Sequence, residues 1–527
     1  MERTHVRCYE NHGLHNPLEI LPSHRLNCRV QIRISELMAT SGVAFGTSGA
    51  RGLATAMTDR VCYTYAAGFL QYLESIGELK HRGEAVAVAG DFRPSSDRVM
   101  EAVCRAAEDK GYQALNCGKI PSPAVALLGL EQKFPAIMVT GSHIPDDRNG
   151  IKFNKSTGEI LKRDEAGMAG QVVEINDAIF DADGGFVKAA APRNIFAEAG
   201  ENYIARYLNC FATDSLNGLR VGVYQHSAVI RDMLVEILAG LGAEVVALGR
   251  SEKFIPVDTE AIRPEDVELA RQWADESRCD AIVSADGDSD RPLISNERGE
   301  WLRGDVAGIL CARFLGADSV STPVSCNSAV EKCGWFREVR RTRIGSPYVI
   351  ASMFEAASTG AKTVVGYEAN GGFLLNSDVA LEGRRLRALP TRDAVIVILG
   401  ILLTAARRGK KVSELVGELP ARFTASDRIK NFPTESSRAI LAKFSTGDVA
   451  NDLRAFESAF GGISGKVVAL DHTDGVRATF ANEEVIHLRP SGNAPELRCY
   501  TEAATNARAL EMNGVALETL RKLAGES

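Results

Sequence analysis

The amino-acid sequence predicts an α/β protein with three related α/β domains in series and a C-terminal α+β domain. Three observations support this prediction: the length of 527 residues, a strand–helix–strand pattern that recurs along the chain, and a different, alternating pattern near the C-terminus. The composition is that of a globular protein, with 45% hydrophobic and 24% charged residues. A chain of this length exceeds the size that one hydrophobic core serves, so we expect about three to four domains.

The recurring pattern is a buried strand, a helix and a second strand. The first copy begins with AVAVAGD (residues 85–91), continues with a helix that ends near Gly111 and closes with a strand that ends at Gly118. A second copy lies at residues 219–249, with the same spacing between its two closing glycines, and a weaker third copy lies at 322–358. Repeated units of this kind predict similar α/β domains in series.

Changes in composition suggest three domain boundaries. We expect domains at residues 38–190, 191–300, 301–420 and 421–527. In the last of these, residues 465–481 alternate between apolar and polar types, as antiparallel strands do, and a helix is expected from about residue 504. Residues 1–37 lack a clear periodicity, so we interpret them as a tail or an upstream start outside the fold, with zinc binding through their histidines as the alternative.

Charge and hydropathy exclude several classes of partner. The net charge of −7 argues against nucleic acid, so we expect small-molecule partners. No apolar run reaches the roughly 18 residues needed to cross a bilayer, and the N-terminal sequence lacks the pattern of a signal peptide. We therefore expect a cytoplasmic protein without a membrane partner. The eleven cysteines are scattered without a CxxC pair, which predicts reduced thiols.

The stretch VSADGDSDRPL places three aspartates, Asp286, Asp288 and Asp290, at alternate positions directly after an apolar strand. If their carboxylates converge to within about 5 Å, each pair repels by about 3 kcal/mol at an effective dielectric constant of about 20. The carboxylates therefore either point into water or surround a cation. Carboxylate oxygens on a short loop suit Mg²⁺, with one coordination position left for a phosphate oxygen.

Two other interpretations of this loop stay open at the level of the sequence. Counted from Asp286, positions 1, 3, 5 and 12 are acidic, with Glu297 at position 12, as in an EF-hand calcium loop. However, Arg291 stands where the EF-hand needs glycine, Pro292 follows it, and a strand rather than a helix precedes the loop. A solvated acidic turn is the second alternative.

Two further motifs lie where a predicted strand meets a loop, the usual position of a site in an open α/β sheet. FGTSGARG combines glycines, which allow close backbone approach to an anion, with Arg51, whose fork of nitrogens can hold phosphate. VTGSHIPDDRNGIKF contains Ser142, His143 and Lys152. A serine is a poor nucleophile without a base or metal, so a turn role is the alternative for Ser142, as a surface position is for Arg51.

The last two motifs are rich in glycine and in hydrogen-bonding groups. In VVGYEANGGFLL, Glu368 and Asn370 can pair with sugar hydroxyls. In HLRPSGNAPELRCY, four residues can form a nest of donors for a phosphate dianion: Arg489, Ser491, Gly492 and Asn493. Taken singly, each motif is also compatible with an ordinary turn.

Taken together and in this order, the five motifs resemble those of the α-D-phosphohexomutase family, over residues from about 43 to 500. DGDSDR is similar to the family's metal loop, TGSHIP to its phosphoserine loop and RPSGNAPELR to its phosphate-binding loop. The resemblance implies four domains around a central cleft that receives one loop from each. It also implies interconversion of hexose 1-phosphate and hexose 6-phosphate through a hexose 1,6-bisphosphate.

The resemblance also implies a role for each motif. Ser142 would carry the phosphoryl group, and an oxygen of that group would bind Mg²⁺ together with Asp286, Asp288 and Asp290. The residues expected at the transferred phosphoryl group are Arg51, His143 and Arg291, with Lys152 as a proton-transfer candidate. The residues expected to bind the sugar and its second phosphate are Gly345, Ser346, Glu368, Asn370, Arg489, Ser491, Gly492 and Asn493.

Three departures from the family pattern bear on function. Gly141 and Ile144 replace alanine and asparagine beside the serine, YEANGG replaces the usual GEMSGH, and NAP replaces TEP in the phosphate loop. On overall similarity, we expect a Mg²⁺-dependent phosphomannomutase, a monomer or homodimer, that also accepts glucose phosphates. The alternatives are phosphoglucosamine mutase, phosphoglucomutase or, in another class, a non-catalytic sugar-phosphate-binding relative.

Overall fold

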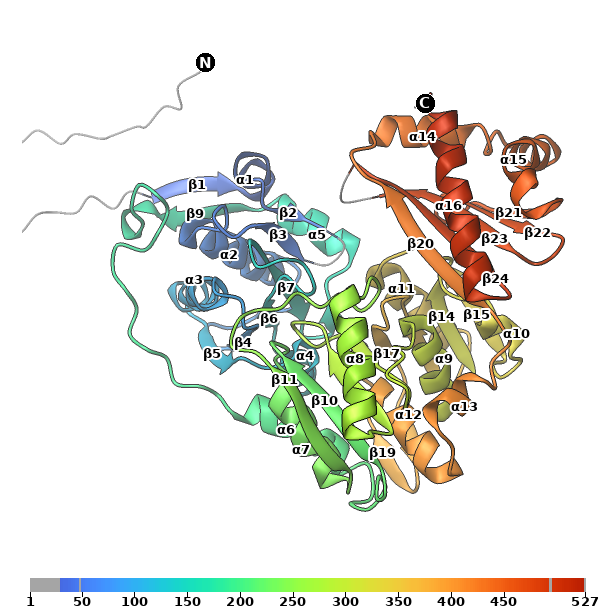
Figure 1. Cartoon of the computed structure of the whole chain (residues 1–527). Helices are drawn as coiled ribbons and strands as arrows, with labels where there is room; N and C mark the ends of the chain where they lie inside the picture. The colour runs from blue at the N-terminus through green and yellow to red at the C-terminus, as the bar shows by residue number, and fades with distance from the viewer. Residues whose placement is uncertain (1–28, 47–48, 492–494, 526–527) are drawn as a thin grey trace, which may run out of the picture.

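The structure is a computed structural model that describes residues 29–46, 49–491 and 495–525 (Figure 1). Three mixed sheets follow one another along the chain, and an antiparallel sheet follows them. We number the domains from first to fourth in the order of these four sheets along the chain. The arrangement confirms the predicted architecture of three α/β domains in series and a C-terminal α+β domain. The domain boundaries expected from composition stay a prediction.

The first domain has a seven-stranded sheet with the order β2-β3-β7-β6-β4-β5, and β8 pairs with β7. Its strands are β2 (Ala44–Phe45), β3 (Ala50–Leu53), β4 (Ala85–Gly90), β5 (Gln113–Gly118), β6 (Ala136–Val139), β7 (Arg148–Lys155) and β8 (Gly158–Glu159). Its helices are α2 (Asp59–Ser75), α3 (Ser96–Asp109), α4 (Ser122–Gln132) and α5 (Lys162–Ala169). Strand β4 is parallel to β5 and β6, whereas β7 returns antiparallel to β6.

The second and third domains repeat this plan in smaller sheets, with the orders β11-β10-β12-β13 and β15-β14-β16-β17. The strands of the second are β10 (Arg220–His226), β11 (Glu244–Arg250), β12 (Ala281–Ala285) and β13 (Pro292–Ile294). Those of the third are β14 (Ser319–Pro323), β15 (Glu338–Thr342), β16 (Val364–Tyr367) and β17 (Phe373–Leu375). Each has a parallel core and an antiparallel last strand. The recurring strand–helix–strand pattern of the sequence is thereby confirmed.

The helices of these two domains follow from the same pattern. They are α6 (Glu198–Leu208), α7 (Arg231–Gly240), α8 (Pro264–Ser277), α9 (Gly304–Phe314), α10 (Ala329–Lys332), α11 (Ser346–Ser358), α12 (Ala394–Arg408) and α13 (Val412–Val416). A small hairpin of β18 (Val379–Leu381) and β19 (Arg384–Leu386) precedes α12.

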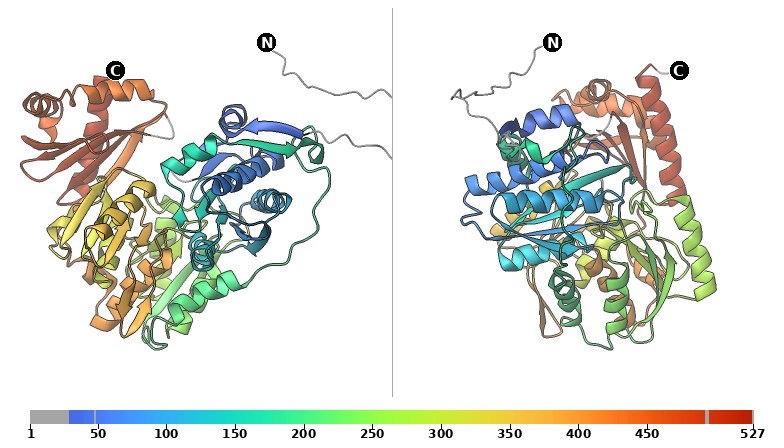
Figure 2. Two further views of the ribbon diagram at one scale, coloured as in Figure 1. Left: turned by 180° about the vertical axis from the view of Figure 1, so that it is seen from behind. Right: turned by 90° about the vertical axis from the view of Figure 1, so that its left-hand side faces the viewer.

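The fourth domain has an antiparallel sheet with the order β20-β24-β23-β22-β21 and its own hydrophobic core. The strands are β20 (Phe423–Ile429), β21 (Val467–Asp471), β22 (Val476–Phe480), β23 (Val485–Pro490) and β24 (Leu497–Ala503). The helices are α14 (Thr434–Ala442), α15 (Val449–Ser464) and α16 (Asn506–Leu523). Figures 1 and 2 show this domain extending from the third domain as a separate body.

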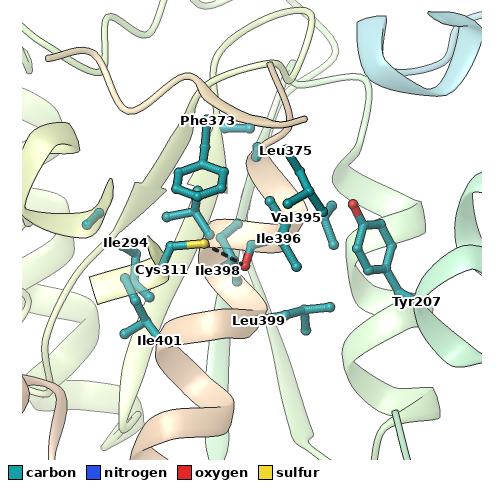
Figure 3. Packing of buried hydrophobic residues seen from close by; sticks show 14 of the residues in the cluster. Tyr207, Ile294, Cys311, Phe373, Leu375, Val395, Ile396, Ile398, Leu399 and Ile401 are labelled. Atoms are coloured by element: carbon teal, nitrogen blue, oxygen red, sulfur yellow. Dashed lines mark hydrogen bonds between the residues drawn. The ribbon is translucent and has the colours of Figure 1, made fainter. Parts of the chain in front are cut away.

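The largest hydrophobic core joins the first three domains, because one cluster of buried side chains contains residues from all three sheets. Its centre is α12, an apolar helix that is buried along most of its length. Figure 3 shows Val395, Ile396 and Leu399 of α12 packed between Phe373 on one side and Tyr207 of α6 on the other. The first three domains are therefore held together by hydrophobic burial as well as by polar contacts.

Residues 29–37 are part of the first domain, so the tail expected over residues 1–37 was wrong for this stretch. They form β1 (Arg29–Arg33) and the start of α1 (Ile34–Ser41), and β1 pairs antiparallel with β9 (Val172–Asn176). The remainder of the predicted tail, residues 1–28, lies outside the described residues. A two-stranded ribbon depends on a partner far away in the sequence, which the local pattern does not reveal.

Two further features of the structure are the character of its helices and the state of its cysteines. Among the described residues, no helix combines the length and the apolar character needed to cross a membrane. The cysteines in the described part of the chain form no disulfide, and all but Cys333 are buried.

We predict that Ile34→Ala destabilises the first domain by about 2–5 kcal/mol, since Ile34 is 1% exposed. A Cβ on Gly68 of α2 would lie 2.8 Å from Ile34 Cδ1, so the two elements pack without space to spare. Chemical denaturation, with hydrogen exchange of the β1 and β9 amides, measures the effect. Ile195→Ala is the matched control because Ile195 is 66% exposed. Equal effects of the two substitutions would contradict the packing of α1 on α2.

Candidate active site

The loops that follow β6, β12 and β16 are the same connection in three repeated sheets, and they meet at one place. Ser142 Oγ in the first loop donates a hydrogen bond to Asp286 Oδ2 in the second, at 2.6 Å. A Cβ on Gly371 in the third loop would lie 3.1 Å from Pro292 Cδ, directly after the second loop. The loops leave the carboxyl ends of their strands, where sites form in open α/β sheets.

The second loop gathers three buried carboxylates. Oxygen atoms of Asp286, Asp288 and Asp290 lie within 4.8 Å of one another, and the three residues are 0%, 0% and 1% exposed. The loop is closed by the amides of Asp290 and Arg291, which both donate to Asp286 Oδ1 at 3.2 Å. Ser289 adopts a left-handed conformation, with φ of 60°, that turns the chain between Asp288 and Asp290. Burial excludes the solvated acidic turn.

The calcium-loop interpretation is also excluded. Glu297, which would be the ligand at position 12 of the loop, accepts hydrogen bonds from the Ser413 backbone amide (3.2 Å) and from Ser413 Oγ (2.5 Å). It does not belong to the carboxylate cluster of the described residues. An apolar strand, β12, precedes the loop in place of the EF-hand helix.

The donor set fits a small divalent cation. Asp288 Oδ1 and Asp290 Oδ1 are buried and have no hydrogen-bond partner among the described residues. Burial, followed by the charges of Asp288 and Asp290, raises the pKa of Asp286 to about 8. Such a group of oxygens is costly to bury by itself, and Mg²⁺ accepts hard carboxylate oxygens of this kind.

Three cations surround the carboxylates. Lys152 Nζ on β7 lies 2.5 Å from Asp288 Oδ2 and 2.5 Å from Asp290 Oδ2. Arg291 Nε lies 3.6 Å from Asp290 Oδ1, and an Arg392 Nη lies 3.1 Å from Asp290 Oδ2. Burial raises the pKa of Asp290, but the charges of these three cations outweigh burial and lower it. The cluster is thus partly neutralised by side chains from three domains.

Ser142 is positioned by its backbone. It follows β6 in a left-handed conformation with φ of 60°, and its amide donates to Thr140 Oγ1 at 2.7 Å. Its side chain is 0% exposed and aims at Asp286 Oδ2. A non-glycine residue at positive φ costs energy, which is typical of functional positions.

Arg93, which the sequence analysis did not select, holds this loop from behind. Its fully buried guanidinium donates to four backbone carbonyls of the loop: Ser142 (2.7 Å), Ile144 (2.6 Å), Pro145 (2.7 Å) and Arg148 (3.1 Å). It is anchored by Asp91 at 3.0 Å. A Cβ on Gly141 would lie 2.7 Å from Arg93 Cζ, which gives a physical reason for glycine where the family pattern has alanine.

His143 and Arg51 lie beside the serine and the metal loop. His143 Nδ1 lies 2.8 Å from an Arg291 Nη and 3.3 Å from Ser142 Oγ. Because an arginine only donates, Nδ1 is an acceptor and the imidazole is neutral. Burial, with the charge of Arg291, lowers the pKa of His143 to about 3. Burial and Arg291 also lower the pKa of Arg51 to about 10, and Arg51 Nε has no hydrogen-bond partner among the described residues.

The third loop places Glu368 next to the cluster. Glu368 is 5% exposed, and its Oε2 has no hydrogen-bond partner among the described residues. Burial raises the pKa of Glu368, and Arg392, 3.8 Å away, opposes this shift. Asn370 Oδ1 accepts a hydrogen bond from the Gly372 amide at 2.9 Å, so Asn370 also shapes the loop.

Gly345 and Ser346 form the start of α11. Gly345 has φ of 131°, which favours glycine, and Ser346 is fully buried. Ser346 Oγ donates to Glu159 Oε2 at 3.3 Å, and Thr391 Oγ1 donates to Glu159 Oε1 at 2.7 Å. Glu159 of the first domain therefore joins two segments of the third.

The last of the five motifs, HLRPSGNAPELRCY, lies at the junction of the third and fourth domains. Arg489 Nε at the end of β23 lies 3.0 Å from Asp474 Oδ2, and the same oxygen accepts the Ile344 amide at 2.9 Å. The Ser491 amide donates to the Glu496 carbonyl at 2.8 Å. Gly492 and Asn493 lie outside the described residues. The arginine is thus beside the segment that contains Gly345.

Three residues of this site, Arg93, Glu159 and Arg392, were missed at the sequence level. Arg93 had a usable signal, because Asp91 and Arg93 directly follow an apolar strand. Arg392 also had one, because the charged pair Arg392–Asp393 precedes an apolar run that forms α12. Glu159 lies in a short strand among charged neighbours and had none.

Comparison with known proteins agrees with this geometry. Models of the phosphoglucomutase/phosphomannomutase family match residues 42–177 (alpha/beta/alpha domain I), 201–299 (domain II) and 303–423 (domain III). The chain belongs to this family. The resemblance inferred from the five motifs is confirmed.

Two relatives match most of the chain. A phosphomannomutase from Salmonella muenchen is 43% identical over 493 residues, 93% of this chain and 98% of the relative. A phosphomannomutase from Sinorhizobium fredii is 44% identical over 463 residues, 88% of this chain and 95% of the relative. A crystal structure of a phosphoglucomutase/phosphomannomutase family protein from Burkholderia thailandensis has the same fold, with a TM-score of 0.68 and 18% identity over 90% of this chain and 97% of its own.

We predict that Arg93→Lys lowers kcat/KM at least about tenfold, because an ammonium cannot reach the four carbonyls that fix the serine loop. Steady-state kinetics on the family reaction measures the loss. Arg98→Lys is the matched control, since Arg98 pairs with Asp59 and its side chain is 42% exposed. Activity of Arg93→Lys within twofold of the control would show that the loop keeps its conformation without Arg93.

Proposed function

We propose that the chain is a Mg²⁺-dependent phosphomannomutase that interconverts mannose 1-phosphate and mannose 6-phosphate through a phosphoserine and a hexose 1,6-bisphosphate. The observation that carries the proposal is the Ser142 hydroxyl, buried and hydrogen-bonded to one of three clustered carboxylates at 2.6 Å. A serine in this position is next to the one cluster of the described residues that fits a metal ion.

In the proposed mechanism, Ser142 would carry the phosphoryl group, and Asp286, Asp288 and Asp290 would hold Mg²⁺. The cation would supply electrostatic stabilisation of the transferring phosphoryl group. Arg51 would add positive charge on the same side, which fits its buried Nε, an atom without a hydrogen-bond partner among the described residues.

His143, Arg291 and Lys152 complete the transfer end of the site. The neutral His143 would orient Arg291 through the 2.8 Å contact, and Arg291 would hold the transferring phosphoryl group. Lys152, in contact with Asp288 and Asp290, would exchange a proton with the reacting hydroxyl of the sugar.

The other end of the site would bind the sugar and the phosphate that does not react. Glu368 and Asn370 would contact sugar hydroxyls, with Gly345 and Ser346 beside them. The donors for the second phosphate would be Arg489, Ser491, Gly492 and Asn493. Separate ends are required because one phosphate must transfer while the other is held without reacting, and the bisphosphate would then reorient between the two ends.

The mannose preference rests on the named relatives. The two phosphomannomutases are 43% and 44% identical, whereas a phosphoglucosamine mutase from Listeria welshimeri is 24% identical over 478 residues. Glucose phosphates are proposed as further substrates, and phosphoglucosamine mutase or phosphoglucomutase activity is the alternative. A non-catalytic relative is disfavoured because Ser142 and all three aspartates are present. Cytoplasmic localisation and a monomer or homodimer stay predictions.

The proposal is tested by assaying the purified protein with Mg²⁺ and a hexose 1,6-bisphosphate. We expect turnover of mannose 1-phosphate, with less or none for glucosamine 1-phosphate, and loss of turnover when EDTA removes the metal. A preference for glucosamine 1-phosphate would replace the substrate assignment. Inactivity on mannose, glucose and glucosamine 1-phosphates would contradict the mutase function.

The serine assignment has a separate test. Intact mass spectrometry should show one phosphoryl group on the protein after incubation with a hexose 1,6-bisphosphate, and none on Ser142→Ala. Ser156→Ala is a control, since Ser156 Oγ bonds Glu78 away from the metal loop. A phosphoryl group that persists in Ser142→Ala would show that another residue is the nucleophile.

A further inference from the structure

The segment Thr391–Arg392–Asp393, directly before α12, connects three domains through consecutive side chains. Thr391 Oγ1 donates to Glu159 of the first domain at 2.7 Å. Asp393 accepts hydrogen bonds from Tyr203 Oη, at 2.7 Å, and from Tyr207 Oη on α6. Asp393 also caps α12 by accepting the Val395 amide at 3.1 Å. The segment is therefore fixed at both ends, and Arg392 lies between them.

The Arg392 side chain is 4% exposed and lies among carboxylates from all three domains. Its guanidinium nitrogens lie 3.1 Å from Asp290 Oδ2, 3.8 Å from Glu368 Oε2 and 3.9 Å from Glu159 Oε1. The chain leaves room for this side chain, because a Cβ on Gly372 would lie 2.7 Å from Arg392 Cδ. A planar fork can face several carboxylates at once, which a compact ammonium does not do.

We propose that Arg392 is a positioning residue for hexose phosphate binding, which acts by holding the Glu368 carboxylate ionised and aimed at the sugar while tying it to the metal loop through Asp290. The inference rests on the proposed function, and it adds a residue outside the five motifs. A carboxylate that is 5% exposed, with one oxygen lacking a hydrogen-bond partner among the described residues, needs a nearby cation to stay charged. Arg392 is the arginine that contacts Glu368 in an ion pair within the described residues.

The effect of Arg392 on metal affinity distinguishes this positioning role from a general structural role. Arg392 is a positive charge next to Asp290, so it opposes a divalent cation held by that carboxylate. Removing the charge should leave the affinity for a divalent cation unchanged or increase it. Collapse of the two loops would instead weaken metal binding and sugar phosphate binding together.

The test is a double-mutant cycle between Arg392 and Glu368, with the Kd of mannose 1-phosphate measured by calorimetry on the full chain. We expect Arg392→Met and Glu368→Gln each to raise this Kd at least about tenfold. In the double variant the Kd should stay within about threefold of that of Glu368→Gln, because Arg392 acts through Glu368. Arg392→Lys should lie between wild type and Arg392→Met.

Two further measurements complete the test. Arg193→Met is the matched control, because Arg193 lies between Glu101 and Glu108 on α3, which carries none of the proposed binding residues. It should leave the Kd of mannose 1-phosphate unchanged. Mn²⁺ titration followed by electron paramagnetic resonance should show that Arg392→Met binds the metal at least as tightly as wild type.

Each contrary result has a distinct meaning. A wild-type Kd for mannose 1-phosphate in Arg392→Met, additive effects in the double variant, or weakened Mn²⁺ binding in Arg392→Met would overturn the positioning role. If the wild-type chain turns over glucosamine 1-phosphate instead, the same cycle is run with that ligand. Absence of binding of any hexose phosphate to the wild-type chain would contradict the proposed function itself.

Discussion

Burial of three carboxylates within 4.8 Å of one another is the constraint around which the first three domains are arranged. At an effective dielectric constant of about 20, each pair of ionised carboxylates repels by about 3 kcal/mol. Because the carboxylates are buried, water does not solvate them and cannot offset this repulsion. The compensating charges come from three domains: Lys152 from the first, Arg291 from the second and Arg392 from the third. These three cations can reach the same carboxylate oxygens only when the three domains are packed together. The charge balance of the cluster therefore depends on the packing of the domains.

Repetition of one sheet plan explains why the loops converge. The connection after β6 carries Ser142, the connection after β12 carries the aspartates, and the connection after β16 carries Glu368. Equivalent loops leave similar sheets at equivalent edges. A shared hydrophobic core that includes α12 brings those edges together. Side-chain chemistry differs from loop to loop, so that in the proposed function one repeated connection would supply the nucleophile, the metal site and a sugar-binding carboxylate.

Local patterns predicted the repeated strand–helix–strand units and singled out the three aspartates, because apolar runs and carboxylate spacing are properties of short segments. Long-range pairing was not accessible in this way. Strand β1 exists because it pairs with β9, and Thr391 meets Glu159 across 232 residues of sequence. Arg93 and Arg392 each lie beside an apolar run, which marks them as candidates, but an arginine in a sequence does not reveal that its partners are carbonyls or carboxylates elsewhere. The spacing of the three aspartates in the sequence was also compatible with a solvated turn, and the burial of their side chains in the structure excludes that alternative.

In the proposed function, the aspartate cluster is one half of a metal site and the serine loop is the other. Crystals soaked with Mn²⁺, after phosphorylation by a hexose 1,6-bisphosphate, would test it through anomalous scattering. We expect one strong peak about 2.2 Å from oxygens of Asp286, Asp288, Asp290 and the phosphoryl group on Ser142. A peak elsewhere, or a peak coordinated by the aspartates without the Ser142 phosphoryl oxygen, would contradict it.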